Sequence, residues 1–185
     1  MPRKIVVITD GDKIATRVVE QVARNVGGRA ISLSGGNPTE VSCEEIVEAI
    51  KKAPHDPVLV MVDDCGAKGT GRGERILVEL AHHPDIEILG VVAVASNTSG
   101  VRGVKPDISV TREGKIVNRA VDKDGHVCGG RIKGDTVDIL NEIDIPLIVG
   151  VGDLGKMEDA DHVKDGARIT TIAVEEILKR SHFRD

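Results

Sequence analysis

Short, continuous apolar runs alternate with longer amphipathic stretches along most of the chain. Residues 4–10 (KIVVITD) form one such run, and residues 13–28 place apolar side chains at helical spacing before ending in Gly27 and Gly28. A continuous apolar run is typical of a strand that is buried on both faces of a sheet, and terminal glycines are typical of a helix end. The two segments therefore predict one strand–helix unit of a parallel sheet.

The same alternation continues towards the C-terminal end. Further strands are expected at residues 29–34, 55–64, 86–96 and 145–153, and helical stretches at 43–53, 74–83, 135–143 and 169–182. Ser42 and Glu45 have the spacing of a capping box, and Thr170 or Thr171 is expected near the start of the last helix. The pattern predicts an α/β protein: one three-layer, Rossmann-like domain over residues 1–185, with a mainly parallel core sheet of five strands.

Residues 97–130 interrupt this alternation. Two short extended runs lie on either side of Glu113 and Gly114. Such runs around a turn are typical of a β-hairpin. We expect a hairpin inserted at about residues 104–122, between two strand–helix units.

The composition argues against nucleic acid as a partner. Phe183 is the one aromatic residue of the sequence, so there is no aromatic platform on which bases could stack. The formal net charge is −5, whereas general affinity for a phosphate backbone needs a basic face. No nucleic-acid partner is therefore expected.

Cysteine spacing and hydropathy bear on the compartment. Cys43, Cys65 and Cys128 are widely separated, which predicts reduced thiols and neither a disulfide framework nor a zinc site. No apolar run approaches the roughly 20 residues that cross a bilayer, and Asp10 comes too early for a signal peptide. We expect contact with a membrane only through partner proteins.

Aspartates follow several of the expected strands. Loops after parallel strands meet at one edge of a sheet, so Asp10, Asp12, Asp63, Asp64 and Asp153 can approach one another there. Clustered carboxylates repel unless they are protonated, paired with cations or bound to a metal ion. The first four are therefore candidate ligands of Mg²⁺. The alternative is that they cap helices and turns, where Asp is a favoured residue.

A glycine-rich loop follows the expected strand at 55–64. It contains Lys68, Gly69, Gly71, Arg72 and Gly73. Backbone N–H groups at the start of the next helix, together with the two cations, could receive a phosphate or carboxylate group. The alternative is a flexible surface loop. The loop is not a Walker A motif, because no Lys-Ser or Lys-Thr stands at the required spacing.

Residues 150–155 (GVGDLG) match the GxGxxG pattern after a strand. Dinucleotide binding is disfavoured, because a helix does not open at once and no further strand follows. Gly152 nevertheless belongs to the loops at the same sheet edge and is a candidate ligand-binding residue. The sequence contains no HExxH motif and no nucleophile elbow, so no catalytic residue is predicted.

Several longer strings carry a family resemblance. They are VVITDGD, SGGNPTEVS, KKAPHDPVLVMVDD, HPDIEILGVVAVASNT, AVDKDG, RIKGDTVD and PLIVGVGDLGKM, in this order. Over nearly its whole length the chain resembles the stage V sporulation protein AE family. The resemblance implies a soluble accessory component encoded with the dipicolinic acid channel of the spore. It also implies a location at the spore inner membrane, with the other channel subunits as partners.

A second resemblance favours an enzyme. An acidic loop after the first strand and paired aspartates after the third are similar to Toprim domains, which use Mg²⁺ in nucleotidyl and phosphoryl transfer. The sequence departs from that pattern in two places. Asp10 and Asp12 stand where a glutamate is expected, and Asp63-Asp64-Cys65-Gly66 stands where Asp-x-Asp is expected. A Mg²⁺-dependent enzyme is therefore the alternative to a non-enzymatic subunit.

Overall fold

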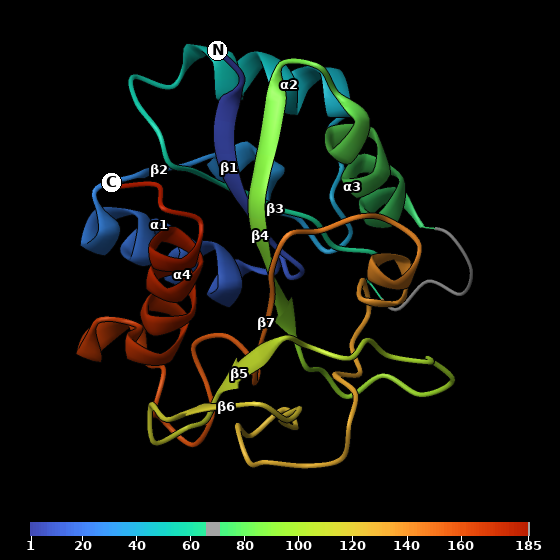
Figure 1. Cartoon of the computed structure of the whole chain (residues 1–185), viewed down its shortest axis with the longest axis vertical. Helices are drawn as coiled ribbons and strands as arrows, with labels where there is room; N and C mark the ends of the chain where they lie inside the picture. Colours follow the sequence, from blue (N-terminus) through green and yellow to red (C-terminus); the bar gives the residue numbers. More distant parts are fainter. Residues whose placement is uncertain (66–70, 185) are drawn as a thin grey trace.

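The computed structural model of the chain describes residues 1–65 and 71–184 (Figure 1). One sheet runs through it in the order β2-β3-β1-β4-β7-β5-β6. The strands are β1 (Arg3–Ile8), β2 (Arg29–Ala30), β3 (Val58–Met61), β4 (Ile86–Val94), β5 (Ile108–Val110), β6 (Ile116–Val117) and β7 (Ile148–Val151). Neighbouring strands are parallel except β5 and β6. The predicted α/β class is confirmed.

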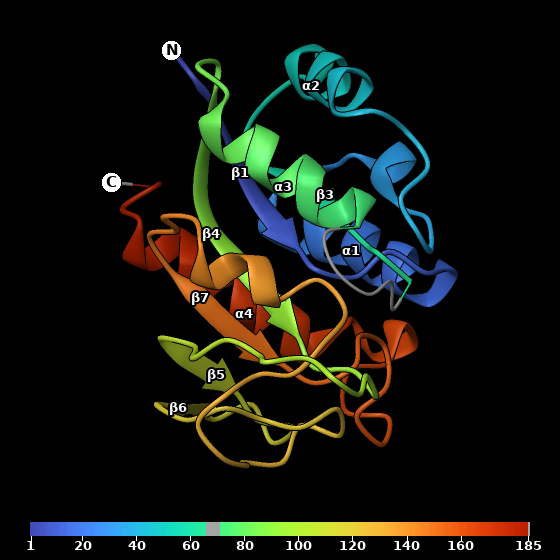
Figure 2. The same cartoon turned by 90° about the vertical axis from the view of Figure 1, so that its right-hand side faces the viewer.

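Helices cover both faces of this sheet (Figures 1 and 2). They are α1 (Lys13–Val26), α2 (Cys43–Lys52), α3 (Arg72–His82) and α4 (Arg168–Arg180), with short 3₁₀ turns η1 (Ser32–Ser34), η2 (Asp138–Asn141) and η3 (Val163–Asp165). Helices α1 and α4 pack on one face, and α2 and α3 on the other, which gives the predicted three layers. No helix within the described ranges is both long and apolar enough to span a bilayer.

The ends of the first two helices follow directly from the sequence. Asp12 precedes α1 and accepts the N–H of Ala15 at 2.8 Å, and Gly27 ends this helix in the left-handed conformation that glycine tolerates best. Ser42 and Glu45 form the predicted capping box at the start of α2. Local side-chain chemistry thus sets where these helices begin and end.

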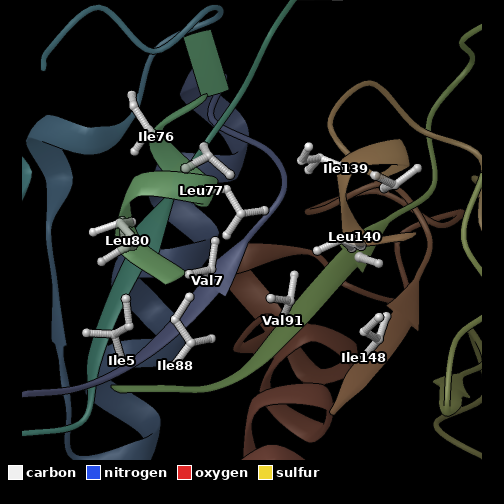
Figure 3. Packing of buried hydrophobic residues seen from close by; sticks show 14 of the residues in the cluster. Ile5, Val7, Ile76, Leu77, Leu80, Ile88, Val91, Ile139, Leu140 and Ile148 are labelled. Carbon is white, nitrogen blue, oxygen red and sulfur yellow. The ribbon is translucent and has the colours of Figure 1, made fainter. Parts of the chain in front are cut away.

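The two faces of the sheet bury separate aliphatic clusters. Along β1, Ile5 and Val7 point to the α3 face, whereas Val6 and Ile8 point to the α1 face. Figure 3 shows α3 and η2 side by side over the first face, with Leu77 and Leu140 among the buried residues. Truncating a large core side chain of this kind typically costs about 2–5 kcal/mol of stability.

Within the described residues the sheet has seven strands, two more than the five predicted for its core. The two extra strands belong to the expected hairpin, whose first strand, β5, pairs in parallel with β7. Asp107 explains the pairing: its N–H donates to the carbonyl of Ile148 at 2.9 Å, and its carboxylate accepts the N–H of Ile148 at 2.7 Å. The hairpin therefore satisfies backbone groups that would otherwise lie unpaired at the edge of β7.

The helical stretch expected at 135–143 shortens to the 3₁₀ turn η2. Asp138, at its start, uses its carboxylate to accept the N–H groups of Arg102 at 3.1 Å and Gly103 at 2.7 Å. This side chain therefore serves a neighbouring loop and does not cap a longer helix.

Candidate functional site

The helices that follow the neighbouring strands β1 and β3 lie on opposite faces of the sheet. The chain leaves β1 towards α1 on one face, and it leaves β3 towards α3 on the other face. In open parallel sheets, ligands bind in the crevice beyond the carboxyl ends of the strands at such a point. The aspartates predicted as metal ligands follow β1 and β3, so the fold brings them to this edge of the sheet, which is called the crevice below.

Asp10 and Asp12 lie in the turn between β1 and α1. Asp10 Oδ1 accepts the N–H of Gly11 at 2.8 Å, and its Oδ2 has no hydrogen-bond partner among the described residues. Burial first, and then the charges of Asp12, Asp63 and Asp153, raise the pKa of Asp10 to about 8, while the bond from Gly11 opposes the rise. The neutral form of Asp10 is therefore favoured at neutral pH.

Asp63 is buried directly after β3. Its N–H donates to the hydroxyl of Thr39 at 3.0 Å, and its carboxylate accepts the N–H of Cys65 at 3.0 Å. Burial is the main reason that the pKa of Asp63 is raised to about 6; the bond from Cys65 opposes the rise, and the charges of Asp135 and Asp12 contribute to it. The charge of Asp63 in turn raises the pKa of Asp10.

Asp64 accepts hydrogen bonds from the first turn of the helix that follows, α3. Its Oδ1 accepts the N–H groups of Gly73 at 2.7 Å and Glu74 at 3.4 Å at the start of α3. Burial raises its pKa, and these two bonds oppose the rise. The capping role that the sequence left open as the alternative is therefore observed for Asp64, as it is for Asp12.

Two further aspartates lie near these carboxylates. The sequence placed Asp153 at this sheet edge without naming it as a metal ligand, and it missed Asp135. Asp135 accepts the hydroxyl of Ser96 at 3.2 Å and the hydroxyl of Thr98, both in the loop after β4. Asp153 follows β7, and its Oδ2 lies 3.0 Å from the Nζ of Lys156. Position after a strand was a signal for Asp153, whereas Asp135 is far from any strand end in the sequence.

Lys156 is the cation that faces these carboxylates. Its pKa is raised first by the hydrogen bond to Asp153 and then by the charges of Asp153, Asp12 and Asp10. We call Asp10, Asp12, Asp63, Asp135 and Asp153 the acidic group, with Lys156 at its margin. One lysine leaves most of this negative charge without a fixed counter-charge among the described residues.

Carboxylate oxygens are the ligands that Mg²⁺ prefers, so the donor type of the acidic group fits this ion. The one cluster of three or more metal-ligating side chains within the described residues lies elsewhere, at Asp122, Asp124 and His126, whose ligand atoms are within 4.8 Å of one another. Mg²⁺ binding at Asp10, Asp12, Asp63 and Asp64 would therefore require these carboxylates to draw closer together. It stays a prediction.

The structure describes only part of the glycine-rich loop that the sequence predicted as an anion site. Lys68 and Gly69 lie outside the described residues. Gly71 precedes α3, and Arg72 donates a hydrogen bond to the carbonyl of Glu40. The N–H groups of Gly73 and Glu74, which an anion could have used, are bonded to Asp64. Anion binding at this loop also stays a prediction.

Close backbone approach accounts for two of the candidate glycines. A Cβ at Gly73 would lie 2.7 Å from the backbone nitrogen of Asp63, and one at Gly152 would lie 2.7 Å from the carbonyl oxygen of Lys123. Both distances are shorter than real Cβ atoms show. Packing alone therefore requires glycine at these two positions, whether or not a ligand binds nearby.

A family model described as Stage V sporulation protein AE1 matches residues 4–181. The chain belongs to this family. The resemblance inferred from the sequence is therefore confirmed, and the protein is a sporulation protein. Comparisons with curated proteins and with solved structures gave no match.

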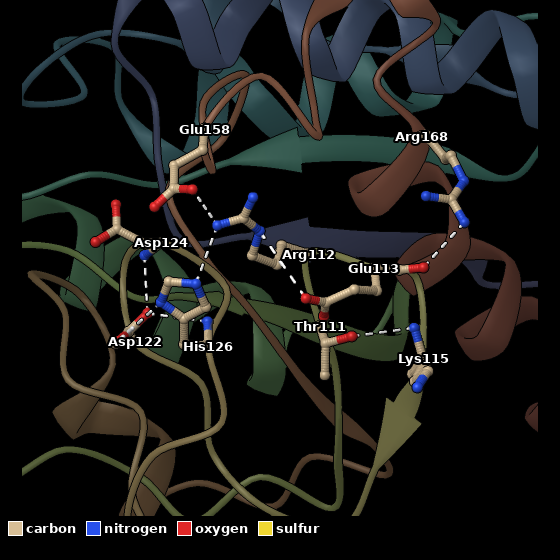
Figure 4. Close-up of polar contacts among 9 residues, drawn as sticks. All are labelled: Thr111, Arg112, Glu113, Lys115, Asp122, Asp124, His126, Glu158 and Arg168. Carbon is tan, nitrogen blue, oxygen red and sulfur yellow. Dashed lines mark hydrogen bonds and ion pairs between the residues drawn. The ribbon is translucent and has the colours of Figure 1, made fainter.

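In this member of the stage V sporulation protein AE1 family, a polar network joins the hairpin to the loop after β7 (Figure 4). Arg112 is its centre, because its guanidinium pairs with Glu158 and lies 3.0 Å from the Nε2 of His126. Arg168 of α4 adds a hydrogen bond to the carbonyl of Glu113 at 3.1 Å. These contacts fix the hairpin relative to the loop after β7 and to α4.

Proposed function

We propose that the chain is a non-enzymatic accessory subunit of the spore's dipicolinic acid channel, active in sporulation and germination. In this proposal it lies at the inner membrane of the spore through contacts with the other channel subunits. The observation that carries the proposal is the family match over residues 4–181, which covers the four helices of the described residues and the sheet except Arg3. The acidic group would then be a surface for a partner or for a bound cation.

A deletion strain tests this role. Spores that lack the protein should accumulate or release dipicolinic acid abnormally, and the wild-type gene should restore both processes. A complementing gene that encodes Asp10→Asn with Asp63→Asn would show whether the acidic group takes part. An Asp144→Asn with Asp165→Asn gene is the matched control, since both residues are exposed and lie outside the group. Normal dipicolinic acid content and normal germination in the deletion strain would contradict the proposal.

The alternative is a Toprim-like, Mg²⁺-dependent enzyme that acts on nucleotides or transfers phosphoryl groups. It is supported by the approach of Asp10 to Asp63 across the crevice, where each carboxylate keeps one oxygen without a hydrogen bond among the described residues. Mg²⁺ bound there would stabilise the charge that develops on a transferring phosphate. Asp10 and Asp63 would hold the ion, and Lys156 would attract the anionic substrate to the same edge.

A metal titration separates the alternative from the accessory role. If Mg²⁺ binds the folded protein with a Kd near 1 mM, then 10 mM Mg²⁺ should add about 1.4 kcal/mol of stability through linkage. The rise in melting temperature should vanish in Asp10→Asn with Asp63→Asn and persist in Asp144→Asn with Asp165→Asn. An unchanged melting temperature in the wild-type protein at 10 mM Mg²⁺ or Mn²⁺ would rule out a metal-dependent enzyme at this site.

A further inference from the structure

A cavity lies beside the loop that follows β4. It has a volume of about 600 Å³ and lies between residues 95–98 and residues 121–133. Lys123, Arg131 and Lys133 contribute three cations to its lining. Ser96, Asn97 and Thr98 supply polar groups on the opposite wall. We call it the basic cavity, and its volume falls in the range of small-molecule sites.

The charge of the surrounding segment differs from that of the rest of the chain. Residues 99–133 contain eight Lys or Arg and four Asp or Glu, a formal net charge of +4, whereas the whole chain carries −5. The remainder of the chain is therefore strongly acidic, and this segment is its basic region. An anion that approaches the carboxyl edge of the sheet is repelled by the acidic group and attracted to the basic cavity.

The cations of the cavity are only partly neutralised. The backbone carbonyl of Lys133 accepts the N–H of Ser96 at 2.9 Å, but its ammonium group makes no hydrogen bond or ion pair with the residues that the structure describes. Arg131 donates one hydrogen bond to the carbonyl of Gly103 at 3.0 Å, which holds the guanidinium in place and leaves its other N–H groups available. Lys123 has a long contact of 3.8 Å with the exposed carboxylate of Asp124. A ligand would thus meet positive charge that the protein does not itself satisfy.

The carboxylate of Asp122 is largely committed to its own turn (Figure 4). Its Oδ1 accepts the N–H groups of Asp124 at 2.9 Å and His126 at 3.0 Å. The opposite wall is also fixed, because the hydroxyls of Ser96 and Thr98 are bonded to Asp135. Gly129 and Gly130 complete the lining with open space at their Cβ positions, so side chains do not block the backbone there.

We propose that the basic cavity binds a small anion that carries two or more carboxylate or phosphate groups. Lys133 and Arg131 are the residues that would contact the anionic groups, with Lys123 at the rim and the Asn97 amide as a further donor. Charge-assisted hydrogen bonds from a guanidinium and an ammonium group suit such oxygens. The proposal does not depend on the channel role, because it rests on the cavity and its charges alone.

Calorimetric titration at low salt tests the proposal, with pyrophosphate and citrate as the two probes. The wild-type protein should bind at least one of them, and the comparison shows whether phosphate or carboxylate groups are preferred. In Lys123→Ala with Lys133→Ala, binding should weaken at least about tenfold, which corresponds to ~1.4 kcal/mol. Lys52→Ala with Lys164→Ala removes the same charge from exposed positions outside the cavity and should leave binding unchanged.

Cys128 provides a local readout, because it lines the basic cavity and its thiol is free and half-buried. A bound anion should slow the alkylation of Cys128 several-fold, while the exposed Cys65 should react at the same rate and serves as a control within the chain. Protection of Cys128 that disappears in the Lys123 and Lys133 variant would support the proposal. Absence of binding by both probes, or equal weakening in the two double variants, would overturn it.

Discussion

Asp64 caps the helix that follows its own strand, because its Oδ1 accepts the N–H of Gly73 at 2.7 Å. The carboxylate thus joins the end of β3 to the start of α3. It also lies where a phosphate group would lie if the glycine-rich loop worked as a phosphate-binding turn. The protein supplies its own anion at this helix, and this distinguishes it from nucleotide-binding folds with the same strand–loop–helix order.

Replacing Asp64 by alanine should destabilise the protein by about 1–2 kcal/mol, because α3 loses its cap and the two N–H groups lose their acceptor. Asp64→Asn should cost less, since the amide oxygen can still accept both bonds. Urea unfolding followed by circular dichroism measures the difference. Asp144→Asn is the matched control at an exposed site. Equal stability of the alanine variant and the wild type would show that the cap contributes little.

Gly73→Ala should be destabilising by about 1–3 kcal/mol, because the new Cβ would press against the backbone of Asp63. The helical preference of alanine would favour the substitution by up to about 1 kcal/mol if the site were open, so the sign of the effect is informative. Gly130→Ala is the control, since nothing lies within 4 Å of its Cβ position. A Gly73→Ala protein more stable than the wild type would refute the close approach of α3 to Asp63.

Asp161 caps the start of α4, where the sequence predicted Thr170 or Thr171. Its Oδ1 accepts the N–H of Thr170 at 2.8 Å, and its Oδ2 accepts the hydroxyl of Thr170 at 2.7 Å and the N–H of Gly155 at 2.9 Å. Because Asp161 is fully buried, Asp161→Ala leaves these donors without partners. We expect a loss of about 2–4 kcal/mol, and a smaller loss for Thr170→Val. Thermal or urea unfolding of both variants distinguishes a buried network from a single weak bond.

The elements that the sequence predicted well are those with a local cause. The apolar stripe of α1, its Asp12 cap and the Ser42–Glu45 capping box all depend on residues within a few positions of one another. Burial on both faces likewise marks β1, β3 and β4 as continuous apolar runs. Helix and strand identities were therefore readable from short windows.

The parts that were missed depend on contacts between distant segments. The pairing of β5 with β7 joins residues about forty positions apart, and no local pattern specifies it. Asp161 caps α4 from nine residues away, through a loop that has no repeating pattern. Asp135 enters the acidic group because Gly134 lets the backbone pass against the carbonyl of Val94. In the sequence, Gly134 and Asp135 look like an ordinary turn.

The acidic group should make the protein less stable as the pH rises. A salt-bridged carboxylate, whose pKa is lowered, has the opposite effect. The pKa of Asp10 is about 8 in the folded protein and near 3.8 when unfolded, so the folded state holds the extra proton between these values. The contribution of Asp10 to the free energy of unfolding is fully present below about pH 4. It is lost as the pH rises towards 8, at up to about 1.4 kcal/mol per pH unit. Asp63, with a pKa of about 6, adds to the same slope at lower pH.

Asp10→Asn tests this dependence, because the amide is neutral at every pH. The variant should lose less stability than the wild type between pH 5 and pH 8, and it should be the more stable of the two at pH 9. Urea unfolding at each pH, with Asp144→Asn as the control, measures both effects. Parallel stability profiles for the wild type and Asp10→Asn would mean that Asp10 is ionised in the folded protein at neutral pH. The crevice would then have to contain a counter-charge for it, such as Lys156 or a bound cation.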